Sequence, residues 1–172
     1  MNSGLENEQP DPIDWEQWLR QHVPALLLYA RLQAPCEADA QDLVQEAAVE
    51  CWRRRAANSD PALPLAYATI RRRAIDLARS TERRARRENT ALDEAPQTWF
   101  DASVEDRERS RVLQQAVSGL SAIHREVITL KVWGGLTFDE IATALEIPSN
   151  TAASRYRYGL EQLRHVVKEI FA

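Results

Sequence analysis

The C-terminal stretch LTFDEIATALEIPSNTAASRYRYGLEQLRHVVKEI, residues 136–170, constrains the fold more than any other part of the sequence. Thr137 is followed three residues later by Glu140, the spacing of a capping box, in which two side chains satisfy free N–H groups at a helix start. Pro148 cannot continue this helix, so a turn and a second helix must follow. The apolar residues of the first helix recur at helical spacing: Phe138, Ile141, Ala142 and Leu145.

The second predicted helix of this stretch has two unlike sides. Its inner side carries apolar or small residues: Ala152, Tyr156, Gly159, Leu163, Val166 and Ile170. Its outer leading end is mainly polar: Asn150, Thr151, Ala153, Ser154, Arg157 and Tyr158. A short helix, a tight turn and a second helix with a polar leading end form the helix-turn-helix layout. A plain helical hairpin shares the apolar spacing, so this pattern favours DNA binding without identifying the class of protein.

The composition predicts an all-α protein. Only five glycines occur in 172 residues, and the chain is 44% hydrophobic and 28% charged. The chain lacks an 18-residue apolar run and a signal peptide, so we expect a cytoplasmic protein with no membrane insertion. Cys36 and Cys51 lack metal-site spacing, so we expect free thiols, no metal and no cofactor.

The net charge of −4 hides a strong segregation of charge. The charge is −8 over residues 1–50, +7 over 51–88, −4 over 89–110 and +1 over 111–172. Because binding responds to the local field, the basic segment favours a polyanionic partner despite the acidic total.

The N-terminal half predicts three helices. The first runs from Trp15 to about Leu32 and is expected to kink or break at Pro24. The second, 37–55, has a predicted buried face made by Leu43, Val44, Ala47, Ala48, Cys51 and Trp52. Another side of it forms an acidic polar stripe, which is either a solvated face or a partner site: Asp42, Gln45, Glu46 and Arg53.

The third helix, about 65–88, follows a loop over 56–64 and is rich in arginine. Its predicted inner face is Leu65, Ala68, Ile75, Leu77 and Ala78. So many arginines repel one another unless a polyanion relieves the repulsion. Tyr67 fits either the core or stacking on an unpaired base. The arginines are Arg71, Arg72, Arg73, Arg79, Arg83, Arg84, Arg86 and Arg87.

The acidic stretch 89–106 predicts a flexible linker, with Trp99 and Phe100 docking on one domain. Residues 1–13 predict a disordered N-terminus. From 107 onward we expect helices over 107–118 and 122–133, ended by Gly134 and Gly135, before the helix-turn-helix. Their predicted packing residues are Leu113, Ala116, Val117, Leu120, Ile123, Val127, Ile128 and Leu130.

Three segments, in this order and spacing, resemble the ECF-type (extracytoplasmic function, group IV) sigma factors of bacterial RNA polymerase. They are DAQDLVQEAAVECW, PLAYATIRRRAIDLAR and LSAIHREVITLKVWGGLTFDEIATALEIPSNTAASRYRYGLEQLR, within residues 15–170. The resemblance implies a non-enzymatic promoter-specificity subunit with domain two at 14–88 and domain four at 107–172. It implies that core polymerase (β′ clamp and β flap regions) and promoter DNA are partners, and it leaves an anti-sigma partner open.

The resemblance also assigns site residues. Core-polymerase binding falls on Asp42, Gln45 and Glu46. The −10 element falls on the loop that receives a flipped base and on the basic helix: Asn58, Ser59, Tyr67, Arg71, Arg72, Arg73 and Arg79. The −35 element falls on Asn150, Thr151, Ala153, Ser154, Arg155, Arg157 and Tyr158, with Arg155 and Arg164 suited to phosphate.

Four positions depart from the family pattern. Arg72 stands where Asn is frequent, and Leu65 where an aromatic is frequent, so the −10 preference is expected to differ. Glu146 stands at the usual Gly of the turn, and Ala153 at a frequent basic residue. The loss of that cation should weaken −35 contact and leave Arg157 with more of the readout.

Two other classes of protein fit parts of the sequence. An ordinary helix-turn-helix regulator would bind a symmetric duplex unaided, but an effector domain needs neither the arginine-rich helix nor the acidic stripe. A protein-binding adaptor would not need a polar leading end. No nucleophile motif, phosphate loop or carboxylate pair is present, and the three histidines are scattered, so no catalytic residue is expected. The acidic 89–106 segment further predicts that the free chain folds up and masks its basic helix.

Overall fold

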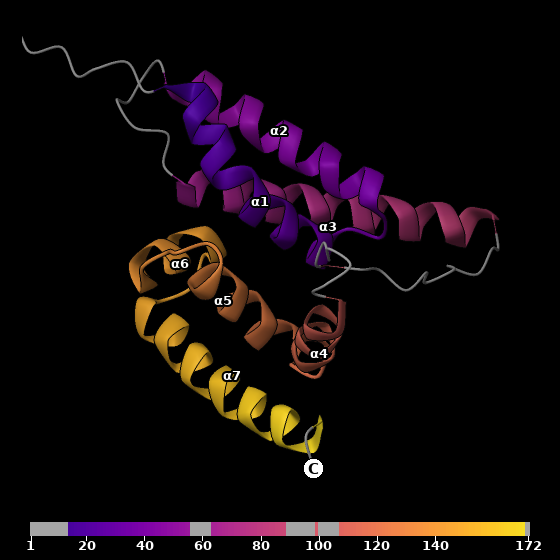
Figure 1. Ribbon diagram of the computed structural model, residues 1–172. Helices are drawn as coiled ribbons and strands as arrows, with labels where there is room; N and C mark the ends of the chain where they lie inside the picture. Colours follow the sequence, from indigo (N-terminus) through magenta and orange to yellow (C-terminus); the bar gives the residue numbers. More distant parts are fainter. Residues whose placement is uncertain (1–13, 56–62, 89–98, 100–106, 171–172) are drawn as a thin grey trace, which may run out of the picture.

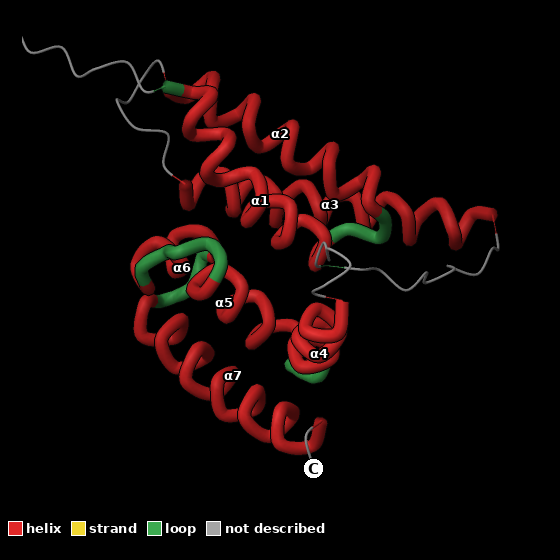
Figure 2. Tube along the Cα trace, viewed as in Figure 1, coloured by secondary structure: helices red, strands yellow, loops and turns green. Residues whose placement is uncertain are grey.

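A computed structural model describes residues 14–55, 63–88, 99 and 107–170 of the chain. These residues form helices and loops without any strand, so the all-α prediction is confirmed (Figure 2). The predicted disordered N-terminus, Asn58, Ser59 and the linker apart from Trp99 lie outside the described residues. The helices are α1 (Trp15–Gln33), α2 (Glu37–Arg55), α3 (Leu63–Glu88), α4 (Arg107–Ser118), α5 (Ala122–Val132), α6 (Phe138–Leu145) and α7 (Ser149–Ile170) (Figure 1).

Helix α1 begins at a side-chain cap and continues through a proline. Asp14 Oδ1 accepts hydrogen bonds from the backbone N–H groups of Glu16 and Gln17, at 3.1 and 3.2 Å. Pro24 lies inside α1, and the helix continues through it to Gln33, so the helix does not break there. Pro24 is exposed. Water can reach the backbone carbonyl that this proline leaves without a donor. None of the described helices is long and apolar enough to cross a membrane.

The buried side of α3 differs from the predicted one. It is formed by Tyr67 and Ile70, together with small residues at helical spacing, Ala66 and Ala74. The predicted inner face is wrong: Leu65, Ala68, Ile75 and Leu77 are half-buried and Ala78 is exposed. Helix α3 packs against α1, α2 and α6, so contacts from several directions rotate its buried strip away from the simple apolar stripe.

Two large apolar residues predicted to be packed are exposed. Trp52 on α2 is 48% exposed, with one edge against the Trp15 ring at a centroid distance of 5.4 Å. Ile123 at the start of α5 is 49% exposed. In each case the residue lies beside the buried strip of its helix. The apolar periodicity predicted a wider buried face than the structure has.

The turn from α5 to α6 is fixed by two glycines and a capping box, as predicted. A Cβ on Gly134 would lie 2.5 Å from the Leu130 carbonyl oxygen, so only glycine fits there, and Gly135 has a φ of +67°. Thr137 Oγ1 accepts from the Glu140 N–H at 3.2 Å, and Glu140 Oε2 accepts from the Thr137 N–H at 2.7 Å. The turn therefore sets α6, and with it α7, at a defined angle.

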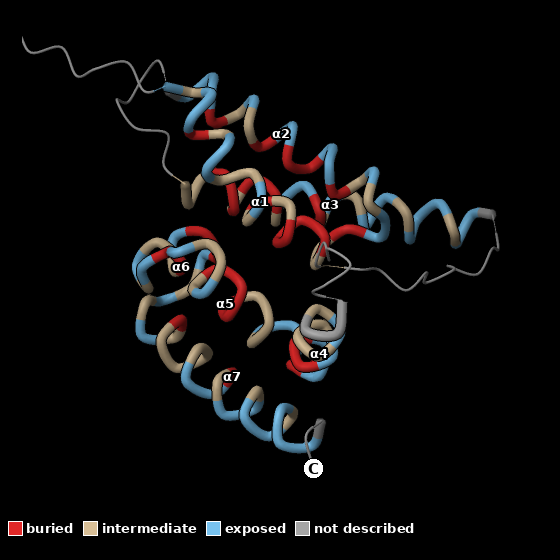
Figure 3. The backbone as a smooth tube through the Cα atoms, viewed as in Figure 1, coloured by how far each residue is buried: buried red, intermediate tan, exposed pale blue. Residues whose placement is uncertain are grey.

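The first helical unit, α1 to α3, and the second, α4 to α7, share one hydrophobic core, and we call this arrangement closed. Helices α1 and α3 of the first unit pack against α5 and α6 of the second, and Figure 3 shows buried residues on the facing helices. Tyr29 and Tyr67 meet edge to face there, with ring centroids 5.2 Å apart at 85°. Helix α7 lies on the opposite side of the second unit from α3 (Figure 1). The shared core includes Tyr29, Tyr67, Val127, Leu130, Leu136 and Ile141.

Candidate polymerase and nucleic-acid interfaces

Helix α2 presents the predicted polymerase residues to solvent. Asp42, Gln45 and Glu46 are all exposed, because Leu43 and Ala47 turn the opposite face of the helix into the core. These three positions follow i, i+3 and i+4 spacing, so they form one continuous polar strip. The structure thus brings the three predicted residues together.

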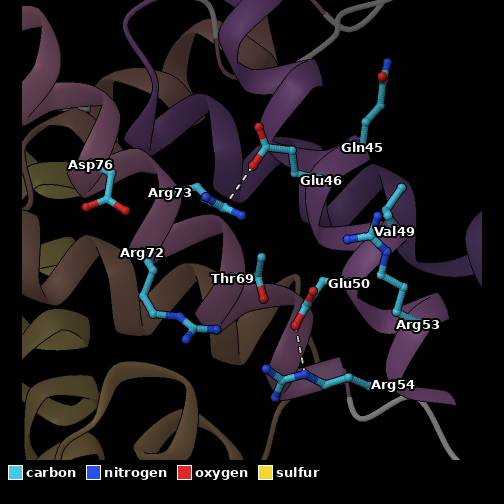
Figure 4. A pocket seen from close by; sticks show the side chains of 10 residues that line it. All are labelled: Gln45, Glu46, Val49, Glu50, Arg53, Arg54, Thr69, Arg72, Arg73 and Asp76. Atoms are coloured by element: carbon cyan, nitrogen blue, oxygen red, sulfur yellow. Dashed lines mark hydrogen bonds and ion pairs between the residues drawn. The ribbon is translucent and has the colours of Figure 1, made fainter. Parts of the chain in front are cut away.

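A cleft of about 650 Å³ separates this strip from the arginines of α3 (Figure 4). Glu46 Oε2 lies 3.0 Å from Arg73 Nε across it, so the predicted polymerase strip and a predicted −10 residue are in direct contact. Arg54 Nε lies 2.8 Å from Glu50 Oε1. The lining residues are Gln45, Glu46, Val49, Glu50, Arg53, Arg54, Thr69, Arg72, Arg73 and Asp76.

Five of these lining residues were not predicted from the sequence: Val49, Glu50, Arg54, Thr69 and Asp76. Val49 is 48% exposed beside the acidic strip, and its spacing from Gln45 and Glu46 would have placed it there. Thr69 is 5% exposed, and its Oγ1 has no hydrogen-bond partner among the described residues. No sequence signal marks Thr69, because its burial depends on how α2 and α3 pack. The described residues also hold no group of three side chains arranged to bind a metal.

The predicted −10 residues on α3 fall into two groups. Arg72, Arg73 and Arg79 are exposed. Tyr67 is 1% exposed, and burial raises the pKa of its hydroxyl. The Arg71 side chain is 31% exposed and points toward the second unit. In the closed arrangement, Tyr67 is therefore covered, and the half-buried Arg71 is engaged by the second unit.

The cover over Arg71 centres on one carboxylate from α5. Glu126 Oε1 lies 3.2 Å from Arg71 Nε and accepts a 2.7 Å hydrogen bond from Tyr29 Oη. Gln33 Nε2 reaches the same oxygen at 3.4 Å. The Glu126 side chain is 13% exposed. Burial, and then the nearby Glu126 charge, raises the pKa of Tyr29, so its hydroxyl stays protonated and donates.

The leading end of α7 is the open counterpart. Asn150, Arg157 and Tyr158 are exposed, and Thr151, Ala153, Ser154 and Arg155 are half-buried. The Arg157 guanidinium carbon lies 5.3 Å from the Tyr158 ring centroid, a cation–π distance. Such a stack holds the guanidinium at the helix surface with its N–H groups free for a base edge or phosphate. The structure thus groups all the predicted −35 residues on one end of one helix.

The sequence matches two family models. Residues 18–84 match Sigma-70 region 2, and residues 110–163 match Sigma-70, region 4. The chain is 30% identical over 152 residues to an RNA polymerase sigma-E factor of Streptomyces avermitilis, covering 88% of this chain and 84% of that protein. It is also 30% identical over 133 residues to the ECF RNA polymerase sigma factor SigK of Mycobacterium ulcerans, covering 73% and 71%.

Solved structures of similar fold include two complexes. One is the sigma factor RpoE with the anti-sigma factor NepR from Bartonella quintana, at a TM-score of 0.67, 22% identity and coverage of 90% of this chain and 97% of that one. The other is CnrH with the cytosolic domain of CnrY, at a TM-score of 0.61, 20% identity and coverage of 90% and 88%. With regions 2 and 4 in order and a relative matched over most of its length, the chain belongs to the ECF-type sigma factors of RNA polymerase.

Proposed function

We propose that this sigma factor docks on core polymerase through α2, grips the melted −10 strand along α3 and reads the −35 element with α7. As a sigma factor, the chain serves promoter-specific transcription initiation. The observation that supports the residue assignment best is the exposure of Asn150, Arg157 and Tyr158 on α7, which places donors and acceptors on a helix of the shape that enters a major groove.

The polymerase contact would use the acidic strip of α2 and the apolar side chain beside it. Glu46 and Asp42 supply charge, and the half-exposed Val49 supplies apolar area that a partner could desolvate. Interfaces commonly place such an apolar centre within a polar rim. The β flap would bind the second unit. We propose domain two at 14–88, the linker at 89–106 and domain four at 107–172.

The −35 contact would rest mainly on Arg157. Arginine makes bidentate hydrogen bonds to guanine O6 and N7, and the stack on Tyr158 holds the guanidinium in place. Ala153 contributes no donor, and Arg155 is better suited to phosphate. We further propose that the protein acts in the cytoplasm and catalyses no reaction of its own. Because a similar solved structure holds an anti-sigma factor, an anti-sigma factor is a candidate partner of this chain.

Run-off transcription tests this proposal. Core polymerase would be supplied with the full chain on a library of promoter fragments, and initiation should depend on the chain. The double variant Asp42→Ala, Glu46→Ala should abolish initiation by loss of polymerase binding, whereas Glu161→Ala, an exposed acid on α7, should leave it unchanged. Absence of initiation from every fragment, with tight binding of the chain alone to a palindromic duplex, would contradict the proposal.

A further inference from the structure

We infer that the free chain blocks the surface of α3 that is proposed to bind the −10 strand. Glu126 pairs with Arg71 in place of a DNA phosphate, and Trp99 holds the two helical units together by contacting both. The inference rests on the proposed role of α3 and concerns its regulation. It specifies which atoms mask the basic helix.

The Glu126 carboxylate lies between the two helical units. Glu126 Oε1 receives the Arg71 guanidinium at 3.2 Å and the Tyr29 hydroxyl at 2.7 Å. A carboxylate and a phosphate offer similar anionic oxygens to an arginine, so only one can hold this face of Arg71. Enclosing a carboxylate between two units is costly unless several donors meet it, and here the donors come from α1 and α3. Glu126 therefore fits a site on the first unit that a strand phosphate would otherwise use.

The Tyr67 ring is also covered in the closed arrangement. The Tyr67 ring is 1% exposed, packs edge to face on Tyr29, and its hydroxyl lies where a Cβ on Gly134 would come within 2.9 Å. A base cannot stack on this ring while α6 and the α5–α6 turn cover it. Strand binding through Tyr67 and Arg71 therefore requires the two units to separate.

Trp99 is the linker residue that the structure describes. Its carbonyl oxygen accepts from Arg31 Nη1 on α1 at 3.1 Å, and its N–H donates to Gln114 Oε1 on α4 at 3.3 Å. The Arg125 guanidinium carbon, on α5, lies 4.9 Å from the Trp99 ring centroid. Trp99 thus contacts both helical units at once.

The two arginines that grip Trp99 are themselves held in place. Arg31 donates to both oxygens of Glu37, at 2.8 and 2.9 Å, and Arg31 is 8% exposed. Arg125 donates to the backbone carbonyls of Val117 and Leu120, at 3.1 and 2.9 Å. Because the two guanidinium groups are already held in place, they lose little conformational freedom when they contact Trp99. The contacts of Trp99 therefore favour the closed arrangement.

Binding of a fluorescent, randomised 12-nucleotide single strand to the full chain without polymerase tests the inference. The variant Trp99→Ala, Glu126→Gln should bind about tenfold more tightly than the wild type, a typical coupling between two sites. Adding Arg71→Ala should remove that gain. Glu161→Gln, a matched exposed change on α7, should have no effect.

Gln114→Ala, which removes the acceptor for the Trp99 N–H and leaves Glu126 in place, keeps the test valid if the double variant loses helix by circular dichroism. It should give a smaller gain in the same direction. Unchanged strand affinity in a helical double variant, or in Gln114→Ala when the double variant does not fold, would overturn the inference. Run-off transcription with the wild type separates the two proposals, because it depends on the sigma role and not on closure.

Discussion

Helices α3 and α7 are the two elements assigned to DNA, and the closed arrangement treats them in opposite ways. On α7, Asn150, Arg157 and Tyr158 are exposed. Helix α3 faces the second unit (Figure 1). There Tyr67 is buried and Arg71 is paired to Glu126. Under the proposed assignment, the helix that reads the duplex presents exposed residues, whereas the helix that binds the single strand must first be uncovered.

This difference separates two kinds of recognition. A major-groove helix reads a duplex that exists before polymerase acts. A single strand exists only after melting, so a chain that exposed its stacking residues at all times would bind unrelated single strands. Under the proposed assignment, covering α3 until polymerase is engaged would therefore favour specificity over affinity.

The same substitution on the two helices should have very different effects on stability. Tyr67→Ala removes a buried ring from the shared core and should lower the free energy of unfolding by about 3–5 kcal/mol. Tyr158→Ala removes an exposed ring and should change it by less than about 0.5 kcal/mol. Urea unfolding followed by circular dichroism measures both. Equal effects would show that α3 is not covered in solution.

Within α7, two arginines should separate base reading from phosphate contact. Arg157→Ala should cost about 1–3 kcal/mol and relax preference within the −35 element, because a base-edge contact is lost. Arg155→Ala should weaken all promoters alike and reduce the salt dependence of binding by about one counterion. Transcription from a −35 mutant series at several salt concentrations checks both. A uniform loss from Arg157→Ala would reassign that residue to phosphate.

The turn before α7 holds a strained residue. Glu146 has a φ of 56°, a left-handed conformation that favours glycine. Glu146→Gly should raise stability by about 1 kcal/mol and Tm by about 2–4 °C. Glu161→Gly in the interior of α7 should instead destabilise by about 1 kcal/mol. Thermal melts of both variants give the comparison, and a lower Tm for Glu146→Gly would contradict the assigned strain.

The smallest effect on stability is expected for Glu37, the partner of Arg31, which donates to the Trp99 carbonyl oxygen. Hydrogen bonds from Arg31 lower the pKa of Glu37, so the folded state favours the carboxylate. The resulting stabilisation is present above the ordinary carboxyl pKa and is lost as pH falls through the lowered value. The contribution should stay below about 1 kcal/mol because Glu37 is partly exposed. Melts of wild type and Glu37→Gln should therefore differ near neutral pH and converge in acid; a constant difference would contradict this.

Local signals in the sequence predicted the local structure well. The capping box at Thr137, the glycine turn after α5 and the bounds of α2 follow from interactions within a few residues, and the structure contains them. These interactions join residues that are close in the sequence, so they can be predicted without knowing how distant segments pack. The exposed acidic strip of α2 follows from the same reasoning.

Features that depend on distant segments were mispredicted or missed. The buried strip of α3 is set by α1, α2 and α6 together, so Tyr67 could not be distinguished as core or surface. Glu126 lies 55 residues from Arg71 and 97 from Tyr29, separations at which periodicity carries no information. Trp99 was expected to dock on one domain, and it contacts both.

The distance between the two units, measured with spin labels in the free chain and in the promoter complex, shows whether the free chain is closed and opens on binding. Cys36 is exposed for labelling, whereas Cys51 is buried, and burial raises the pKa of its thiol to about 11, which keeps it unreactive. The second label would be placed by Glu161→Cys. We predict one narrow distance in the free chain and a different distance once polymerase and promoter are bound. A broad distribution in the free chain, or the same distance in both states, would contradict it.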